Sequence, residues 1–240
     1  KNLANNLSKD QPAYALQAKG LNGESEPHDS IEEMASHYIK EIRAKYPEGP
    51  YALAGFSFGG IIAFEMAKQL KSEDVKVKHL ALFDSYVYPS YYYTNPLIKR
   101  VIAKSYDLAQ LIYMGLNWFS SQKNFKRRNE LIKLRLSGLF LRLKYGKKKQ
   151  YEIQFNRTPE IDKKHALAFI RYNIIPSNIK VDLFRATKNI YFAHDFKYLG
   201  WKKIALGGIC KHMVKGTHSD MFLSPTVEEF AKTLQNVLDN

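Results

Sequence analysis

The chain has 240 residues, of which 45% are apolar, and a formal net charge of +14. The apolar content excludes a disordered chain, and the length suits one domain with a substantial core. No stretch reaches the roughly 20 apolar residues that a membrane-spanning helix needs. Cys210 is the only cysteine, which excludes an intrachain disulfide, and no Cys/His cluster has the spacing of a zinc site. The first residues, KNLANNLSKD, carry no export signal, and we predict a cytoplasmic protein.

The N-terminal part of the chain predicts one strand and one helix. The strand spans Ala13 to Gln17, and a polar loop follows it. The helix begins at Ser30, because Ser30-x-x-Glu33 forms a capping box, in which the hydroxyl and the carboxylate satisfy backbone donors reciprocally. Apolar residues then recur at helical spacing until Pro47-Glu-Gly-Pro50 ends the helix.

Strands and helices alternate in the middle of the chain. Tyr51 to Gly55 is a short predicted strand that runs into a glycine-rich turn, and Ile61 to Leu70 is the helix after it. The next strand, Val75 to Phe83, ends in the apolar run LALF, which is typical of a strand covered on both faces.

Two more strands and a final helix follow residue 172. The strands are Val181 to Arg185 and Ile209 to Val214, and Ser224-Pro225 opens the helix with Ser as N-cap and Pro at the first helical position. This alternation predicts an α/β fold, with a mostly parallel sheet and helices on both faces.

Residues 86–172 interrupt the alternation. They hold eighteen Lys/Arg and five Asp/Glu, so +13 of the net charge of +14 lies here. We interpret this segment as a basic helical lid inserted into a core of residues 1–85 and 173–240, with Lys144 to Gln150 as a mobile linker. A basic surface attracts an acidic protein or a membrane surface, and its confinement to one insert argues against a nucleic-acid-binding protein.

The strongest motif is the pentapeptide Gly55-Phe56-Ser57-Phe58-Gly59, which has the pattern G-x-S-x-G. Between a strand and a helix this pattern predicts a nucleophile elbow, with Ser57 strained and exposed above the sheet edge. Glycines on both sides of Ser57 are expected to prevent a clash in the turn. The helix N-terminus favours a developing oxyanion, and the backbone N–H of Phe58 is its expected donor. The alternative is an ordinary glycine-rich turn.

A nucleophilic serine needs a base and an orienting acid. His218 follows the last strand, where a hydrolase of this kind places its base, whereas the alternative His212 lies inside that strand. Two residues are candidates for the acid: Asp84 directly after an apolar strand, and Asp195 in the loop before the last strand. Both keep the chain order serine, acid, histidine, and spacing alone does not decide between them.

Several segments resemble, in order, the thioesterase domains of nonribosomal peptide and polyketide synthases. They are GPYALAGFSFGGIIAFEMA around the elbow, QPAYALQAKGLNGE and SIEEMASHYIKEIR before it, and LALFDSY, VDLFRATK, LGW and KGTHSDMFLSP after it. The resemblance implies an α/β-hydrolase fold with an inserted helical lid. In that family the acid follows the strand after the elbow helix, which favours Asp84 over Asp195.

The resemblance also implies a function. Such domains release an acyl or peptidyl chain, by hydrolysis or cyclisation, from the 4′-phosphopantetheine arm of a carrier protein in the same synthase. Ser57, His218 and Asp84 would form the catalytic triad, and no metal or cofactor is needed. The alternatives are a stand-alone editing (type II) thioesterase and a non-catalytic binding module, the latter at a membrane through Tyr91 to Tyr93 and the basic helices.

The sequence departs from the family at its start. The family begins with strands and with a loop that supplies a second oxyanion N–H, before the position of Gln11-Pro12, and only ten residues precede Gln11 here. We therefore expect the natural protein to be longer at its N-terminus, with an apolar strand and a glycine-rich loop encoded upstream of Lys1.

Overall fold

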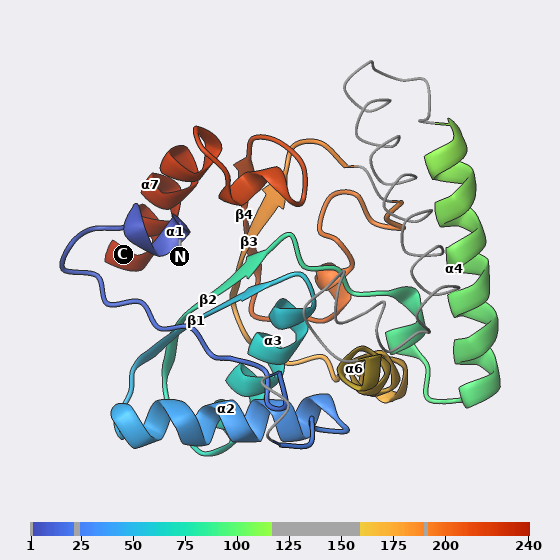
Figure 1. Ribbon diagram of the computed structural model, residues 1–240, viewed down its shortest axis with the longest axis horizontal. Helices are drawn as coiled ribbons and strands as arrows, with labels where there is room; N and C mark the ends of the chain where they lie inside the picture. The colour runs from blue at the N-terminus through green and yellow to red at the C-terminus, as the bar shows by residue number, and fades with distance from the viewer. Residues whose placement is uncertain (1, 22–24, 117–158, 190–191) are drawn as a thin grey trace, which may run out of the picture.

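Four short apolar segments form one parallel sheet. The strands are β1 (Tyr51–Phe56), β2 (Val77–Phe83), β3 (Val181–Ala186) and β4 (Ile209–Val214), and they lie side by side in that order. The computed structural model describes residues 2–21, 25–116, 159–189 and 192–240 (Figure 1). All three strand pairings within these ranges are parallel, as the alternation of strands and helices predicted.

Helices cover both faces of the sheet. α2 and α3 lie on one side, and α7 with the short α1 lies on the other (Figure 1). The helices in chain order are α1 (Asn2–Asn5), α2 (Ile31–Lys45), α3 (Phe58–Ser72), α4 (Pro96–Leu116), α6 (Pro159–Arg171) and α7 (Thr226–Asp239), with 3₁₀ turns at Pro89–Tyr92, Trp201–Lys203 and Asp220–Phe222.

The apolar run that ends β2 is buried on both sides. Leu80 and Leu82 pack into the core beneath α2 and α3, whereas Ala81 and Phe83 pack into a second core beneath α7. Successive side chains of a strand point to opposite faces, so an uninterrupted apolar run contributes side chains to both cores. These cores fix the carboxyl end of β2, where the candidate acid Asp84 follows.

The predicted capping box at the start of α2 forms with one difference. The Ser30 hydroxyl accepts a hydrogen bond from the backbone N–H of Glu33 at 3.1 Å, as expected for an N-cap. The Glu33 carboxylate accepts from the N–H of Asp29, also at 3.1 Å, rather than from that of Ser30. Both interactions still satisfy backbone donors near the helix start.

One predicted element is absent, and several others differ from the structure in their bounds by one to three residues. Ala13 to Gln17 forms no strand: Tyr14 and Leu16 are exposed, and the ring of Tyr14 packs beside that of Tyr46. A strand needs a neighbour to satisfy its backbone groups, and local pattern does not reveal whether one is present. The last helix begins one residue later than predicted, with Pro225 as its N-cap, while the Ser224 hydroxyl donates to the Glu228 carboxylate at 2.7 Å.

The two ends of the insert are joined to each other, and its C-terminal end is joined to the core. The buried ammonium of Lys99 in α4 donates to the carbonyls that end α6, those of Ile170, Arg171 and Tyr172, at 2.9–3.3 Å. The Tyr172 hydroxyl in turn donates to Glu65 of α3 at 2.6 Å. The predicted linker, residues 144–150, lies outside the described residues. Among the helices described, none is both long enough and apolar enough for a bilayer span.

Candidate active site

Ser57 occupies a strained turn between β1 and α3. Its backbone has φ 52° and ψ −119°, a conformation that a non-glycine residue adopts at a cost of about 1–3 kcal/mol. The Ser57 N–H donates to the carbonyl of Phe83 at 3.0 Å, and the Ser57 carbonyl accepts from Gly60 at 3.1 Å. The Ser57 hydroxyl makes no capping hydrogen bond to the backbone of α3. These features are those of a nucleophile elbow.

Two glycines, Gly55 and Gly60, permit this turn. Gly55 was predicted to have this role, whereas Gly60 was not. A Cβ on Gly55 would lie 2.2 Å from the carbonyl oxygen of Gly59, and a Cβ on Gly60 would lie 2.4 Å from Oγ of the buried Ser85. A Cβ on Gly59 would meet open space. The expectation of a steric role is therefore right for Gly55 and wrong for Gly59, and Gly60 takes that role.

Asp84 and His218 meet at the carboxyl edge of the sheet. Oδ2 of Asp84 is 2.8 Å from Nδ1 of His218, and Oδ1 accepts the backbone N–H of Ala186 at 3.0 Å. Asp84 directly follows β2, is 1% exposed and has φ 44°. The ring of Phe56, the last residue of β1, stacks on the imidazole with centroids 4.4 Å apart. A buried carboxylate thus fixes the orientation of a half-buried imidazole beside the elbow.

The alternative residues have other contacts. Asp195 accepts the backbone N–H groups of Lys197, Tyr198 and Gly200, so its carboxylate caps its own loop. His212 lies within β4 and contacts Asp182 of β3 at 3.0 Å. The structure therefore brings His218 together with Asp84, and it gives His212 a different carboxylate.

A neutral tyrosine borders the Asp84–His218 pair. The ring centroid of Tyr86 is 6.3 Å from that of His218. Burial raises the pKa of the Tyr86 phenol well above its usual value, and the negative charge of Asp84 raises it further. The phenol therefore remains protonated at neutral pH, and it adds no charge beside the imidazole.

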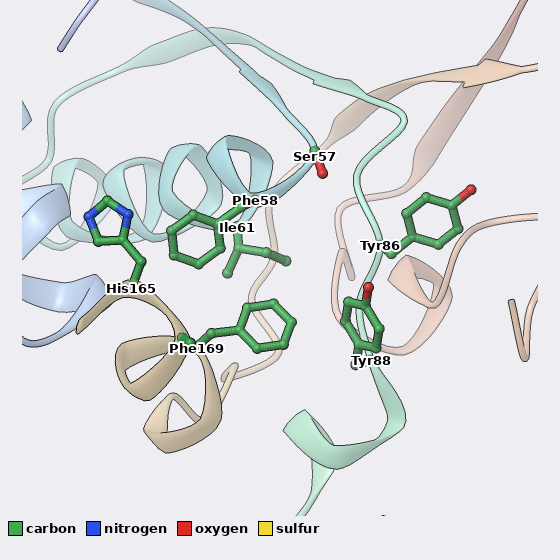
Figure 2. Close-up of a pocket in the computed structure, with 8 residues that line it drawn as sticks. Ser57, Phe58, Ile61, Tyr86, Tyr88, His165 and Phe169 are labelled. Atoms are coloured by element: carbon green, nitrogen blue, oxygen red, sulfur yellow. The ribbon is translucent and has the colours of Figure 1, made fainter. Parts of the chain in front are cut away.

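A cavity of about 250 Å³ opens beside Ser57 (Figure 2). Phe58 and Ile61 enter it from α3, and His165 and Phe169 enter it from α6. The remaining wall comes from Tyr86 and Tyr88 in the segment after β2 and from Ala166 in the middle of α6. The lining is mainly apolar and aromatic, as in many small-molecule sites.

The sequence profile of the thioesterase domain family matches residues 1–238. The chain belongs to the thioesterase domain family. The fold agrees, because this thioesterase domain has the parallel sheet with helices on both faces of an α/β-hydrolase. The family resemblance inferred from the elbow and its flanking segments is confirmed.

Relatives of this thioesterase domain are multidomain synthases. The nonribosomal peptide synthetase atqA of Aspergillus terreus (strain NIH 2624 / FGSC A1156) is 29% identical over an alignment of 262 residues. The alignment covers 99% of this chain and 26% of atqA. The polyketide synthase PksR of Bacillus subtilis (strain 168) is 47% identical over 75 residues, which cover 31% of this chain and 3% of PksR. The domain thus spans about a quarter or less of these two proteins.

A solved thioesterase domain shares the fold. The NocB thioesterase domain from the nocardicin cluster, in covalent complex with a fluorophosphonate nocardicin G analogue, superimposes with a TM-score of 0.58 at 21% identity. The alignment covers 94% of this chain and 82% of that one.

Sequence reasoning missed the residues that shape the cavity in this thioesterase domain. Tyr88, His165 and Phe169 lie within the insert, whose helices were predicted without their packing partners. His165 and Phe169 of α6 contact Phe58 of α3: the rings of Phe58 and Phe169 lie 5.8 Å apart, and those of Phe58 and His165 lie 5.9 Å apart. The run of tyrosines after β2 is the signal that points to an aromatic wall.

Proposed function

We propose that this domain releases an acyl or peptidyl chain from a carrier-bound phosphopantetheine thioester, through an acyl-enzyme on Ser57. The observation that carries the proposal is the position of the Asp84–His218 pair beside the strained Ser57 at one edge of the sheet. A nucleophile, a base and an acid that orients the base are the parts of a serine-hydrolase triad.

The mechanism assigns one role to each group. Ser57 Oγ attacks the thioester carbonyl while His218 takes its proton, and Asp84 holds the imidazole tautomer and stabilises the imidazolium. The backbone N–H of Phe58, at the first turn of α3, donates to the oxyanion. The tetrahedral intermediate then expels the pantetheine thiolate, which takes the proton from His218. Water, or a nucleophile within the substrate, next attacks the Ser57 ester while His218 takes its proton. His218 then returns that proton to Ser57 Oγ as the ester bond breaks and the product leaves.

The cavity supports binding of the acyl group next to Ser57. Its walls are mainly apolar, through Phe58, Ile61 and Phe169, so they favour an apolar or aromatic portion of the chain near the thioester carbonyl. Burying such a group stabilises binding by about 25 cal/mol per Å² of apolar surface removed from water.

The partner in this proposal is an acyl or peptidyl carrier protein, as a domain of the same synthase. The relatives are synthases within which the matching segment is one part. The net charge of +13 on residues 86–172 would attract an acidic carrier surface to this segment of the chain.

Intact-mass spectrometry after incubation with a panel of acyl- and peptidyl-pantetheine thioesters tests the proposal. We expect a covalent acyl adduct on the protein and on Ser72→Ala, a control that removes an exposed serine at the end of the same helix. Ser57→Ala should form no adduct and should not react with a fluorophosphonate. An adduct on Ser57→Ala would overturn the assignment of the nucleophile.

A further inference from the structure

Three chemically different ligand groups share one face of β3 and β4. Asp182 of β3 is the register partner of Cys210 of β4, and two residues further along Phe184 is the partner of His212. Residues two apart on a strand point to the same face, so the Cys210 thiol and the His212 imidazole lie on the same side as the Asp182 carboxylate. Sequence spacing did not reveal this cluster, because Asp182 joins it from a neighbouring strand.

The donor atoms are close enough to bind one ion. One atom from each residue lies within 4.8 Å of the other two, and Nε2 of His212 is 3.0 Å from Oδ1 of Asp182. Tetrahedral zinc holds its nitrogen, oxygen and sulfur ligands at about 2.0–2.3 Å, which places those ligands roughly 3.3–3.8 Å from one another. Small side-chain rotations therefore suffice to convert the present contacts into a coordination shell.

The local packing holds two of the ligands in place. Asp182 is buried, and the ring of Phe184 stacks on the imidazole of His212 with centroids 4.6 Å apart at an interplanar angle of 23°. Cys210 is exposed, which leaves the thiol side open for entry of an ion and for a water ligand. A partly rigid site with one open side suits three protein ligands and one exchangeable ligand.

The donor set selects the kind of cation. A thiolate and an imidazole favour borderline-soft ions such as Zn²⁺ and Co²⁺, whereas Mg²⁺ and Ca²⁺ take oxygen ligands. Lys180 precedes β3 and Lys211 lies between the two β4 ligands in sequence, so long-range attraction of cations is weak here. Affinity must come from the direct bonds, above all from the thiolate, and that requirement disfavours hard cations further.

We propose that Asp182, Cys210 and His212 form a Zn²⁺ site on the β3–β4 face, separate from the Ser57 centre. Binding releases the thiol proton of Cys210 to solvent, because the thiolate is the metal ligand. Phe83 of β2 is the register partner of Phe184, which places the Asp84–His218 pair about three residues, roughly 10 Å, further along the strands than Asp182. The ion therefore takes no part in acyl transfer.

Titration of the tag-free, reduced and metal-free protein with Co²⁺ tests the site directly. We expect one Co²⁺ per chain, with the intense thiolate-to-cobalt charge-transfer band that only a cysteine ligand produces, and displacement of that band by Zn²⁺. Saturating Zn²⁺ should also protect Cys210 from alkylation by iodoacetamide, as measured by peptide mass spectrometry. Alkylation at an unchanged rate, or cobalt spectra without the charge-transfer band, would overturn the proposal.

Variants separate this site from binding elsewhere on the chain. Cys210→Ser and His212→Ala should each weaken Zn²⁺ binding more than about 100-fold, because even second-shell changes cost 10–100-fold. Met213→Ala is the matched control, since it changes an exposed residue of the same strand on the opposite face. Wild-type Zn²⁺ affinity in Cys210→Ser would contradict the site. Fluorophosphonate labelling of Ser57 should be equal in Cys210→Ser and in the unchanged protein, so failure of this site and failure of the proposed catalytic function can be told apart.

Discussion

Among the described residues, two carboxylate–imidazole pairs have similar geometry in different surroundings. Asp84 and His218 lie 2.8 Å apart, Asp182 and His212 lie 3.0 Å apart, and the two histidine side chains are 16% and 17% exposed. The first pair lies beyond the carboxyl end of β2, beside a serine with positive φ. The second lies within two regular strands, beside Cys210.

The difference shows that a carboxylate–imidazole contact does not by itself define a hydrolase site. What distinguishes the first pair is the backbone around it: the elbow at Ser57 and a left-handed Asp84 that directs its carboxylate to two donors. The second pair has no comparable turn, and the third side chain beside it is the thiol of Cys210 rather than the hydroxyl of a serine with a strained backbone. We therefore expect the pairs to respond differently to the same substitutions.

The largest expected difference concerns the orienting acids. Asp84→Asn should lower the turnover of a pantetheine thioester by about 10⁴, because losing the acid leaves the base in the wrong tautomer. Asp182→Asn should change turnover less than about tenfold, since it does not touch His218. Both rates are measured with a chelator present, and Asp195→Asn serves as a loop control. If Asp195→Asn lost its turnover while Asp84→Asn kept it, Asp195 rather than Asp84 would be the orienting acid.

A smaller effect tests whether the first pair depends on close packing. Gly60→Ala should lower the free energy of unfolding by about 1–3 kcal/mol and slow fluorophosphonate labelling, because the new methyl group collides with Ser85, the neighbour of Asp84. Gly59→Ala is the matched control, and open space around it predicts a change of at most about 0.5 kcal/mol.

A double substitution identifies the cause of that loss. Adding Ser85→Gly to Gly60→Ala removes the two Ser85 atoms nearest to the new methyl group and leaves the Gly55 carbonyl oxygen at 3.2 Å. The double variant should therefore recover part of the stability in urea denaturation. Equal losses in Gly59→Ala and Gly60→Ala would show that helix flexibility, rather than the contact with Ser85, sets the effect.

The smallest expected effect is the salt dependence of KM, which should differ between carrier-bound and free thioester substrates of the Ser57 centre. Raising salt from low to moderate ionic strength should raise KM for a carrier-bound thioester by about tenfold, because steering by the basic insert is screened beyond about 10 Å at 0.1 M. A free pantetheine thioester lacks an acidic surface, and its KM should stay nearly constant. Equal salt dependence of the two substrates would exclude electrostatic recognition of the carrier.

Sequence motifs indicated the residues of the first pair, whereas nothing in the sequence indicated the second pair. The elbow carries its signal in five consecutive residues, and His218 follows a predicted strand. The residues alone left Asp84 and Asp195 as candidates for the acid, and the family resemblance favoured Asp84. Asp182 meets His212 and Cys210 only through the register of β3 and β4, which no single segment encodes. The same limitation explains Ala13–Gln17, whose strand-like pattern finds no partner among the described strands.

The glycines of the elbow show a further limit of prediction from sequence. The pattern G-x-S-x-G draws attention to Gly59, whereas the atom that excludes a side chain belongs to Ser85 and faces Gly60. A steric requirement depends on what lies opposite, and that neighbour, Ser85, lies in the segment after β2, 25 residues later in the chain. Sequence therefore located the turn correctly but assigned one of its constraints to the wrong residue.

The anchor at Lys99 has a consequence for how such domains diversify. Because Lys99, near the start of α4, donates to the carbonyls that end α6, the segment from Lys99 to Ile170 begins and returns at nearly the same place. Closing a longer loop at a fixed point costs only about 0.6 kcal/mol for each doubling of its length. Recombination or gradual growth can thus replace this stretch to suit new products, while the sheet and its elbow keep their register.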